Sequence, residues 1–186
     1  GDGGNLIQIP ALPFDENQVL STVTVNTGSG TDSILVGGST ITINSGGGSD
    51  TITLLGIDPD YATQVNSDKE FEDSNYGAVM NIDTGAGSAT VNLGAYLDDA
   101  FLVSGNIVAM EGSSITGADV TLFVNTHADL RAADLSGITS IVMDDDAFGY
   151  SGRGFPVGSD STSNASSLTL LDTQVVALGE AVFSTQ

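Results

Sequence analysis

The chain has 186 residues, of which 24 are acidic and three are basic, so its formal net charge at neutral pH is −21. A field of this sign repels phosphate backbones and anionic lipid head groups, so we expect no nucleic-acid partner, and we look to multivalent cations instead. No apolar run reaches the roughly 20 residues that span a bilayer, so we expect no membrane insertion. The chain has no cysteine and one histidine, which excludes thiolate metal sites and argues against a zinc centre.

The composition indicates a folded, nearly all-β protein. Forty per cent of the residues are hydrophobic and the mean hydropathy is +0.15, which excludes an acidic disordered chain. Gly, Ser, Thr and Asp are abundant, whereas the usual helix formers Leu, Glu, Lys and Arg are few. The chain opens within a glycine-rich phrase, Gly1 to Asn5, without an initiator Met, and we interpret it as a processed product or a piece of a longer protein.

An internal repeat governs the N-terminal part. Segments 23–39, 41–57 and 80–96 align without gaps, and each reads strand, glycine-rich turn, strand. The turns at Gly28 and Gly46 are one 18-residue period apart, and the turn at Gly85 follows after one period plus 21 residues. Apolar residues alternate in each strand, which predicts parallel sheets stacked around an apolar interior. We interpret the extra residues, 57–77, as an acidic loop inserted into one turn of a solenoid.

The turns carry a recognisable motif. The phrase GGGSDTIT from Gly46 fits the pattern Gly-Gly-x-Gly-x-Asp-x-apolar-x at every defined position, and TGSGTDSI from Thr27 departs from it only at its first residue. The phrase TGAGSATV from Thr84 keeps the glycines but has Ala89 in place of the aspartate. These turns resemble the RTX calcium-binding repeats of bacterial S-layer proteins and large adhesins. In that family two nonapeptides form one 18-residue turn of a β-roll, and Ca²⁺ lies between the loops of successive turns.

The resemblance implies a set of calcium ligands along one edge of the roll. Ca²⁺ takes six to eight hard oxygen ligands, which carboxylates and main-chain carbonyls supply. The implied ligands are the carboxylates of Asp32 and Asp50 and the carbonyls of Gly28, Gly30, Gly46 and Gly48, and a weaker second site would use the carbonyls of Gly85 and Gly87. The alternative is that these are plain glycine–aspartate turns that bind no ion.

Other acidic and catalytic candidates are weaker. Acidic residues between 58 and 73 fit a solvated loop, and those at 144–146 follow a strand and could share an ion only in part. His127 and Asp129 could be combined with one of many serines as a triad, but the chain has no Gly-x-Ser-x-Gly elbow. We therefore expect no catalytic residues and no enzymatic activity.

The C-terminal half keeps the β pattern but loses the period. Its expected strands are 106–110, 120–125, 138–143, 168–171 and 175–178, and they continue the solenoid or, alternatively, form an antiparallel sandwich. The expected organisation is therefore an N-terminal lead-in over 1–22, a β-roll over 23–100 with the insertion 57–77, and an irregular β-helical region over 101–186.

The sequence favours an extracellular, calcium-dependent structural module of a bacterial surface protein. Its expected partners are calcium ions and either further copies of itself or neighbouring domains of the same long chain. One alternative is the calcium-binding accessory domain of an enzyme exported by type I secretion, and another is a phage fibre module. A third is an ice- or surface-binding solenoid, which the Thr-x-Thr phrases at Thr22, Thr40 and Thr51 suggest.

Overall fold

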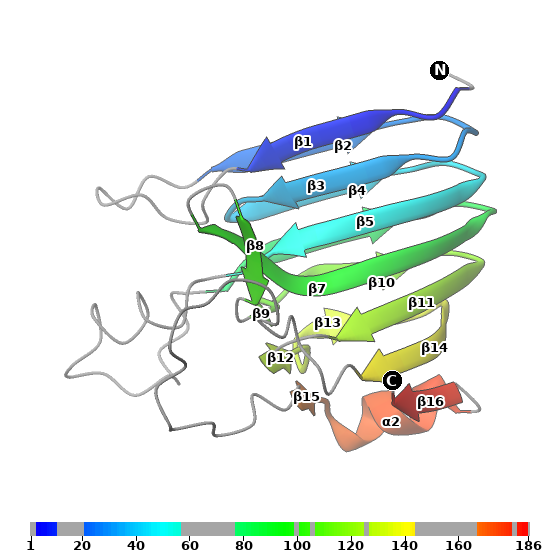
Figure 1. Cartoon of the computed structure of the whole chain (residues 1–186). Helices are drawn as coiled ribbons and strands as arrows, with labels where there is room; N and C mark the ends of the chain where they lie inside the picture. Colours follow the sequence, from blue (N-terminus) through cyan, green and yellow to red (C-terminus); the bar gives the residue numbers. More distant parts are fainter. Residues whose placement is uncertain are drawn as a thin grey trace.

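The computed structural model describes residues 3–10, 21–56, 77–98, 101–104, 107–124, 127–143, 167–179 and 182–185. Within these ranges the chain forms an all-β parallel solenoid, which confirms the expected fold class (Figure 1). In the N-terminal part, successive strands alternate between two stacked sheets. We call these the front sheet and the back sheet after their places in Figure 1.

Two large sheets and one small sheet contain the strands. In spatial order, the front sheet contains β1 (Leu6–Pro10), β3 (Ser33–Gly37), β5 (Ser49–Leu55), β7 (Ser88–Asp98), β11 (Asp119–Val124), β14 (Ile138–Met143) and β16 (Val182–Thr185), and β8 (Phe101–Ser104) folds back antiparallel on β7. The back sheet contains β2 (Thr22–Asn26), β4 (Thr40–Asn44), β6 (Val79–Asp83), β10 (Ser113–Thr116) and β13 (Ala133–Asp134). The small sheet contains β9 (Ile107–Val108), β12 (His127–Asp129) and β15 (Ser167–Thr169).

The strand register confirms the period and the place of the insertion. Thr22 of β2 pairs with Thr40 of β4, an offset of 18 residues, and Thr40 pairs in turn with Val79 of β6, an offset of 39. Two residues join β3 to β4, whereas 56–78 join β5 to β6 at the same end of the stack. Most of the insertion, 57–76, lies outside the described residues.

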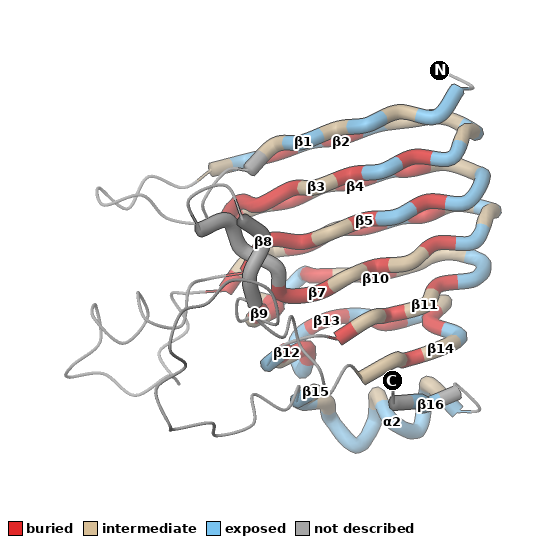
Figure 2. Tube along the Cα trace, viewed as in Figure 1, coloured by how far each residue is buried: buried red, intermediate tan, exposed pale blue. Residues whose placement is uncertain are grey.

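The core lies between the front and back sheets. Along each strand the inward residues are buried and the outward residues are exposed or half-buried, as the alternating colours of Figure 2 show. The largest fully buried side chains are Ile34, Ile41, Ile43, Ile52, Leu54, Met80, Ile82, Leu93, Ile115, Leu122, Leu130 and Ile141. Each such side chain contributes about 1.5–3 kcal/mol of transfer free energy, so one continuous apolar column stabilises every turn of the solenoid.

The solenoid continues through the C-terminal half. β11 pairs in parallel with both β7 and β14, so the antiparallel sandwich considered for this region is wrong. β14 has the bounds that the sequence predicts. β1, within the segment expected to be a lead-in, pairs in parallel with β3 and extends the front sheet.

The strand expected at Val175–Leu178 is wrong, because this segment belongs to the helix α2 (Asp172–Leu178). Its paired valines favour a strand locally, but Gln174 fixes the helix instead. The Gln174 Oε1 atom accepts a bond of 2.7 Å from the Leu171 amide, and its Nε2 atom donates to the carbonyls of Leu130 and Ala133. The helix thereby covers the C-terminal end of the stack (Figure 1). Within the described part of the chain, no helix is both long enough and apolar enough to cross a bilayer.

Candidate cation site at the glycine turns

Four glycine turns stack at one edge of the solenoid, on the right in Figure 1. We name them after the residue that precedes or begins each front strand at the same register: the Asn5, Asp32, Asp50 and Ala89 turns. The register of the front sheet places these four residues in one column. All eight residues that the sequence predicts as ligands lie in the last three of these turns.

Close stacking explains why the turns need glycine. A side chain at Gly46 would collide with the carbonyl oxygen of Gly28, and one at Gly85 would collide with that of Gly46. The same holds for Gly48 against Gly30 and for Gly87 against Gly48. Gly46 also has a φ of +84°, a conformation that side chains disfavour. Backbone packing alone therefore accounts for Gly46, Gly48, Gly85 and Gly87.

Several of the carbonyls expected to face an ion already accept hydrogen bonds between turns. The Gly28 carbonyl accepts from the Gly47 amide at 3.2 Å, and the Gly48 carbonyl accepts from the Ser88 amide at 2.9 Å. The Gly85 carbonyl accepts from the Ala118 amide at 3.0 Å. Each carbonyl oxygen has a second lone pair, so these groups could serve an ion only as shared acceptors.

The two motif aspartates point into the interior and are almost fully buried. Asp32 is 1% exposed and Asp50 is 3% exposed. The Asp32 Oδ1 atom accepts from the Asn5 backbone amide at 2.8 Å and from Asn5 Nδ2 at 2.7 Å. The Asp50 Oδ1 atom accepts from the Asp32 backbone amide at 3.0 Å. Each carboxylate thus binds the backbone of the turn above it.

Three buried oxygens in this region have no hydrogen-bond donor. They are Asp32 Oδ2, Asp50 Oδ2 and Ser45 Oγ, and the last belongs to the Asp50 turn. A buried polar atom without a partner is costly, and it is rare in native proteins. Two carboxylate oxygens and a hydroxyl are hard donors of the kind that Ca²⁺ takes. In their chemistry, though not by any measured convergence, these three oxygens are therefore of the kind that a calcium ion takes as ligands.

Asp32 is held in its charged form. The Thr27 hydroxyl, the amides of Asn5 and the Gly28 backbone amide lower the pKa of the Asp32 carboxyl below its usual value, and these effects outweigh burial, which raises the pKa. The Thr27 Oγ1 atom also lies 2.8 Å from the Ser45 carbonyl oxygen, and its single proton can serve only one acceptor at a time. At neutral pH the site therefore carries a negative charge that a cation would neutralise.

The column becomes apolar below Asp50. Asp50 pairs with Ala89, Ala89 pairs with Val120, and Val120 pairs with Ile138. The Ala89 turn has no carboxylate in the column, and Asp83 beside it accepts a bond of 2.9 Å from the Gly85 amide. The weaker second site expected at Gly85 and Gly87 therefore has only main-chain oxygens of its own turn.

Two residues of this region lie outside the set that the glycine motif predicts. Asn5 lies in register with Asp32, and Ser45 contributes the orphan hydroxyl. A signal for Asn5 exists, since the spacing of Gly3, Asn5 and Ile7 repeats that of Gly30, Asp32 and Ile34. No pattern marks Ser45, because its burial depends on the stacking of distant turns.

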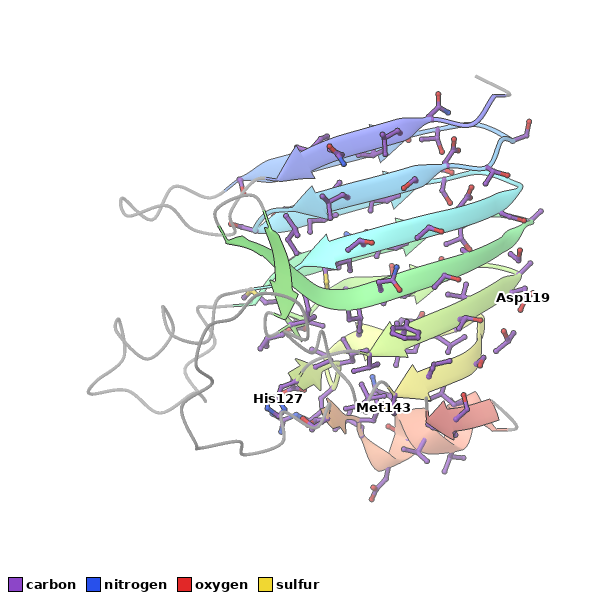
Figure 3. All side chains as sticks on the ribbon, viewed as in Figure 1. Asp119, His127 and Met143 are labelled. Atoms are coloured by element: carbon purple, nitrogen blue, oxygen red, sulfur yellow. The ribbon has the colours of Figure 1, made fainter. Side chains whose placement is uncertain are left out.

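The catalytic candidates lie at the opposite end of the strands from the glycine turns. Figure 3 shows His127 and Asp119 at opposite ends of the strands, and Asp119 begins a front strand at the glycine-turn edge. His127 Nδ1 lies 2.6 Å from Ser167 Oγ on the neighbouring strand β15. Both carboxylate oxygens of Asp129 accept bonds from Arg131, so this aspartate is engaged by a residue outside the candidate triad. The acidic clusters at 58–73 and 144–146 lie outside the described residues.

The Thr-x-Thr phrases are divided between two sheets. Thr22 and Thr24 pair in register with Thr40 and Thr42 on the back sheet. The third phrase begins at Thr51 on β5 of the front sheet. The three phrases therefore do not build the single flat array that an ice-binding face would require.

Comparisons with protein-family models, curated proteins and solved structures give no match for this chain. The resemblance to RTX repeats therefore depends on the residues of the glycine turns alone. Across the described ranges, no three His, Asp or Glu side chains gather closely enough to hold a metal, so an ion at the turns would need hydroxyl or main-chain oxygens beside the two carboxylates.

Proposed function

We propose that the chain is an extracellular, calcium-dependent structural module of a bacterial surface protein, of the S-layer or adhesin kind. The observation that carries the proposal is the pair of buried aspartates, Asp32 and Asp50, whose Oδ2 atoms make no well-formed hydrogen bond. An uncompensated buried carboxylate costs several kcal/mol. A divalent cation between the two turns would compensate both carboxylates at once.

The lower part of the same column supports this interpretation. Ala89 and Val120 occupy the equivalent positions there, and the strands still pair in parallel. Stacking therefore does not need a carboxylate at this position. Each aspartate bonds the backbone of the turn above through Oδ1, and cation binding is the further role that its Oδ2 atom fits.

Bound calcium would supply charge neutralisation and a cross-link between turns. The donors available from this chain are the orphan oxygens of Asp32, Asp50 and Ser45 and the second lone pairs of the turn carbonyls. Since the unfolded chain lacks the site, binding would contribute directly to folding. Extracellular modules bind calcium with dissociation constants of about 10⁻⁴–10⁻³ M, so such a module would fold fully only outside the cell.

The RTX resemblance supports the proposed location and partners. Members of that family leave the cell by type I secretion and serve in long surface chains. We propose a scaffold without catalytic activity, whose partners are further copies of itself or neighbouring domains of one long chain. An accessory domain of a secreted enzyme would use the same calcium site, and activity in flanking sequence would distinguish it.

Thermal melting of the full chain tests the proposal. In excess EDTA we expect the melting midpoint to fall by about 10 °C or more relative to millimolar CaCl₂, the size expected when a structural ligand is removed. Asp50→Ala should remove most of this difference. Asp134→Ala, which deletes an exposed carboxylate at a lower turn, is the matched control and should keep it. An identical midpoint in EDTA and CaCl₂ would exclude calcium as a structural element.

The two aspartates should differ in importance. In its described hydrogen bonds the Asp32 carboxylate already receives two donors from Asn5, whereas that of Asp50 receives only the Asp32 amide. We therefore expect Asp50→Ala to weaken calcium binding more than Asp32→Ala does. Relative to the unchanged chain, Asp50→Ala should raise the dissociation constant at least about tenfold, or roughly 1.4 kcal/mol. Isothermal titration of both variants measures the order, and the reverse order would refute this ranking.

A further inference from the structure

The Asn5 turn is a true member of the stack. A side chain at Gly30 would collide with the Gly3 carbonyl, and one at Gly4 would come within 2.7 Å of the Thr31 carbonyl oxygen. The Ser33 amide donates to the Asn5 carbonyl at 2.8 Å, as the Thr51 amide does to the Asp32 carbonyl. Asn5 therefore occupies in its turn the position that aspartate occupies in the next two.

The side chain of Asn5 compensates the Asp32 carboxylate by hydrogen bonding, where a cation would otherwise do so by its charge. Its Nδ2 atom donates to Asp32 Oδ1 at 2.7 Å and to the Gly3 carbonyl at 2.9 Å, which uses both amide protons. The Asn5 backbone amide donates to the same carboxylate oxygen at 2.8 Å. A neutral amide thus compensates the upper side of the Asp32 carboxylate, and it adds no second charge that an ion would have to balance.

We propose that Asn5 closes the interface between the Asn5 and Asp32 turns to cations, so that this interface is held by hydrogen bonds and the ion lies between the Asp32 and Asp50 turns. This inference rests on the function proposed above. The first interface then stays stacked at any calcium concentration, and the second interface depends on the ion. An aspartate at position 5 would place two carboxylates at the first interface without the side-chain donor and would make that interface depend on calcium as well.

Asn5→Asp in the full chain tests the proposal, with calcium stoichiometry from isothermal titration and melting midpoints in EDTA and in CaCl₂. We expect Asn5→Asp to bind one more Ca²⁺ per chain than the unchanged protein. In EDTA its midpoint should fall by about 5 °C or more, and CaCl₂ should restore it. Asn5→Ala should lower the midpoint equally in both solutions and add no ion. Asn26→Asp places the same charge on the exposed face of β2 and should change neither quantity.

The outcomes separate this inference from the function on which it rests. If the unchanged protein binds calcium and Asn5→Asp binds no more, with an EDTA midpoint equal to that of Asn26→Asp, Asn5 does not close the first interface to cations and the calcium site stands. If the unchanged protein binds no calcium, the proposed function and this inference both fail.

Discussion

The upper and lower parts of the solenoid share one architecture but differ in the residue that fills the turn column. In the upper part the column holds Asn5, Asp32 and Asp50, and in the lower part it holds Ala89 and Val120. Both parts have parallel strands, the same two sheets and the same apolar interior. Ladder hydrogen bonds and a continuous core are therefore sufficient for stacking in the lower part, whereas in the upper part the buried carboxylates also bond the backbone of the turn above.

The two parts also differ in how the chain travels between turns. In the upper part an offset of 18 residues joins β2 to β4 and β3 to β5, whereas Leu6 of β1 lies 27 residues before its partner Ser33 on β3. In the lower part Ser114 lies 33 residues after its partner Asn81, and Thr139 bonds Asp119 across 20 residues. The strands β8 and β9 lie between Asn81 and Ser114 and lengthen the first of these two offsets. The pairing of neighbours survives, which shows that register is fixed by the inward apolar residues rather than by loop length.

The largest effect should come from adding a single carbon to a stacked glycine. Gly46→Ala would force a side chain against the Gly28 carbonyl and would strain a residue with φ of +84°. We expect the free energy of unfolding to fall by about 3 kcal/mol or more. Gly47→Ala in the same turn meets no atom within 4 Å and should change it by less than about 0.5 kcal/mol. Chemical denaturation compares the two, and equal losses would show that stacking does not impose glycine at Gly46.

An aspartate placed in the lower part of the turn column should create a calcium site there, like the one proposed for the upper part. Ala89→Asp introduces a buried carboxylate directly below Asp50 in the column. In EDTA we expect a loss of about 3 kcal/mol, because the charge has no compensation. Calcium should recover most of this loss and bind with one additional ion per chain. A loss that calcium leaves unchanged would mean that stacked aspartates in this fold do not create a cation site.

Removing the insertion should have a small effect. Deleting 57–76 joins Gly56 to Gly77 and leaves three residues between β5 and β6, close to the two that join β3 to β4. The pairs on either side, β4 with β6 and β5 with β7, are made by residues that the deletion keeps. We expect the far-ultraviolet circular dichroism spectrum and the calcium affinity to stay nearly unchanged. Loss of the β signal would show that the segment contributes to the core.

The smallest effect should come from breaking the ion pair between Arg131 and Asp129 in the lower part. The Arg131 guanidinium lowers the pKa of the Asp129 carboxyl, and both side chains are partly exposed. Arg131→Ala should therefore cost less than about 1 kcal/mol at pH 7. Because the folded pKa is depressed, this contribution is complete above the unfolded value of about 3.9 and disappears as the pH falls through the folded value. Unfolding of both proteins between pH 7 and pH 3 measures the difference, and a difference that grows on acidification would reverse the assigned sign.

Local signals explain what the sequence could predict. The alternation of apolar residues and the glycine spacing are visible within one turn, so the period, the place of the insertion and the bounds of β14 follow directly. The helix α2 could not be predicted, because Gln174 reaches the carbonyls of Leu130 and Ala133 more than 40 residues away. The valines of that segment carry only their local preference for strands.

The candidate site was predictable in its residues and not in its geometry. The motif identifies Asp32 and Asp50, but their inward direction and burial arise from stacking. The engagement of the Gly28 and Gly48 carbonyls in hydrogen bonds between turns depends on partners 19 and 40 residues away, Gly47 and Ser88. Sequence spacing alone therefore overestimates the main-chain oxygens that are free for an ion.

An anomalous-difference map of crystals grown with and without calcium tests the central claim most directly. We expect a peak between the Asp32 and Asp50 turns in the calcium crystals, with carboxylate oxygens of both residues at about 2.3–2.6 Å. We expect no peak between the Asn5 and Asp32 turns, and no peak at either place without calcium. Calcium crystals in which Asp32 Oδ2 and Asp50 Oδ2 contact only water or protein would contradict the proposed calcium site.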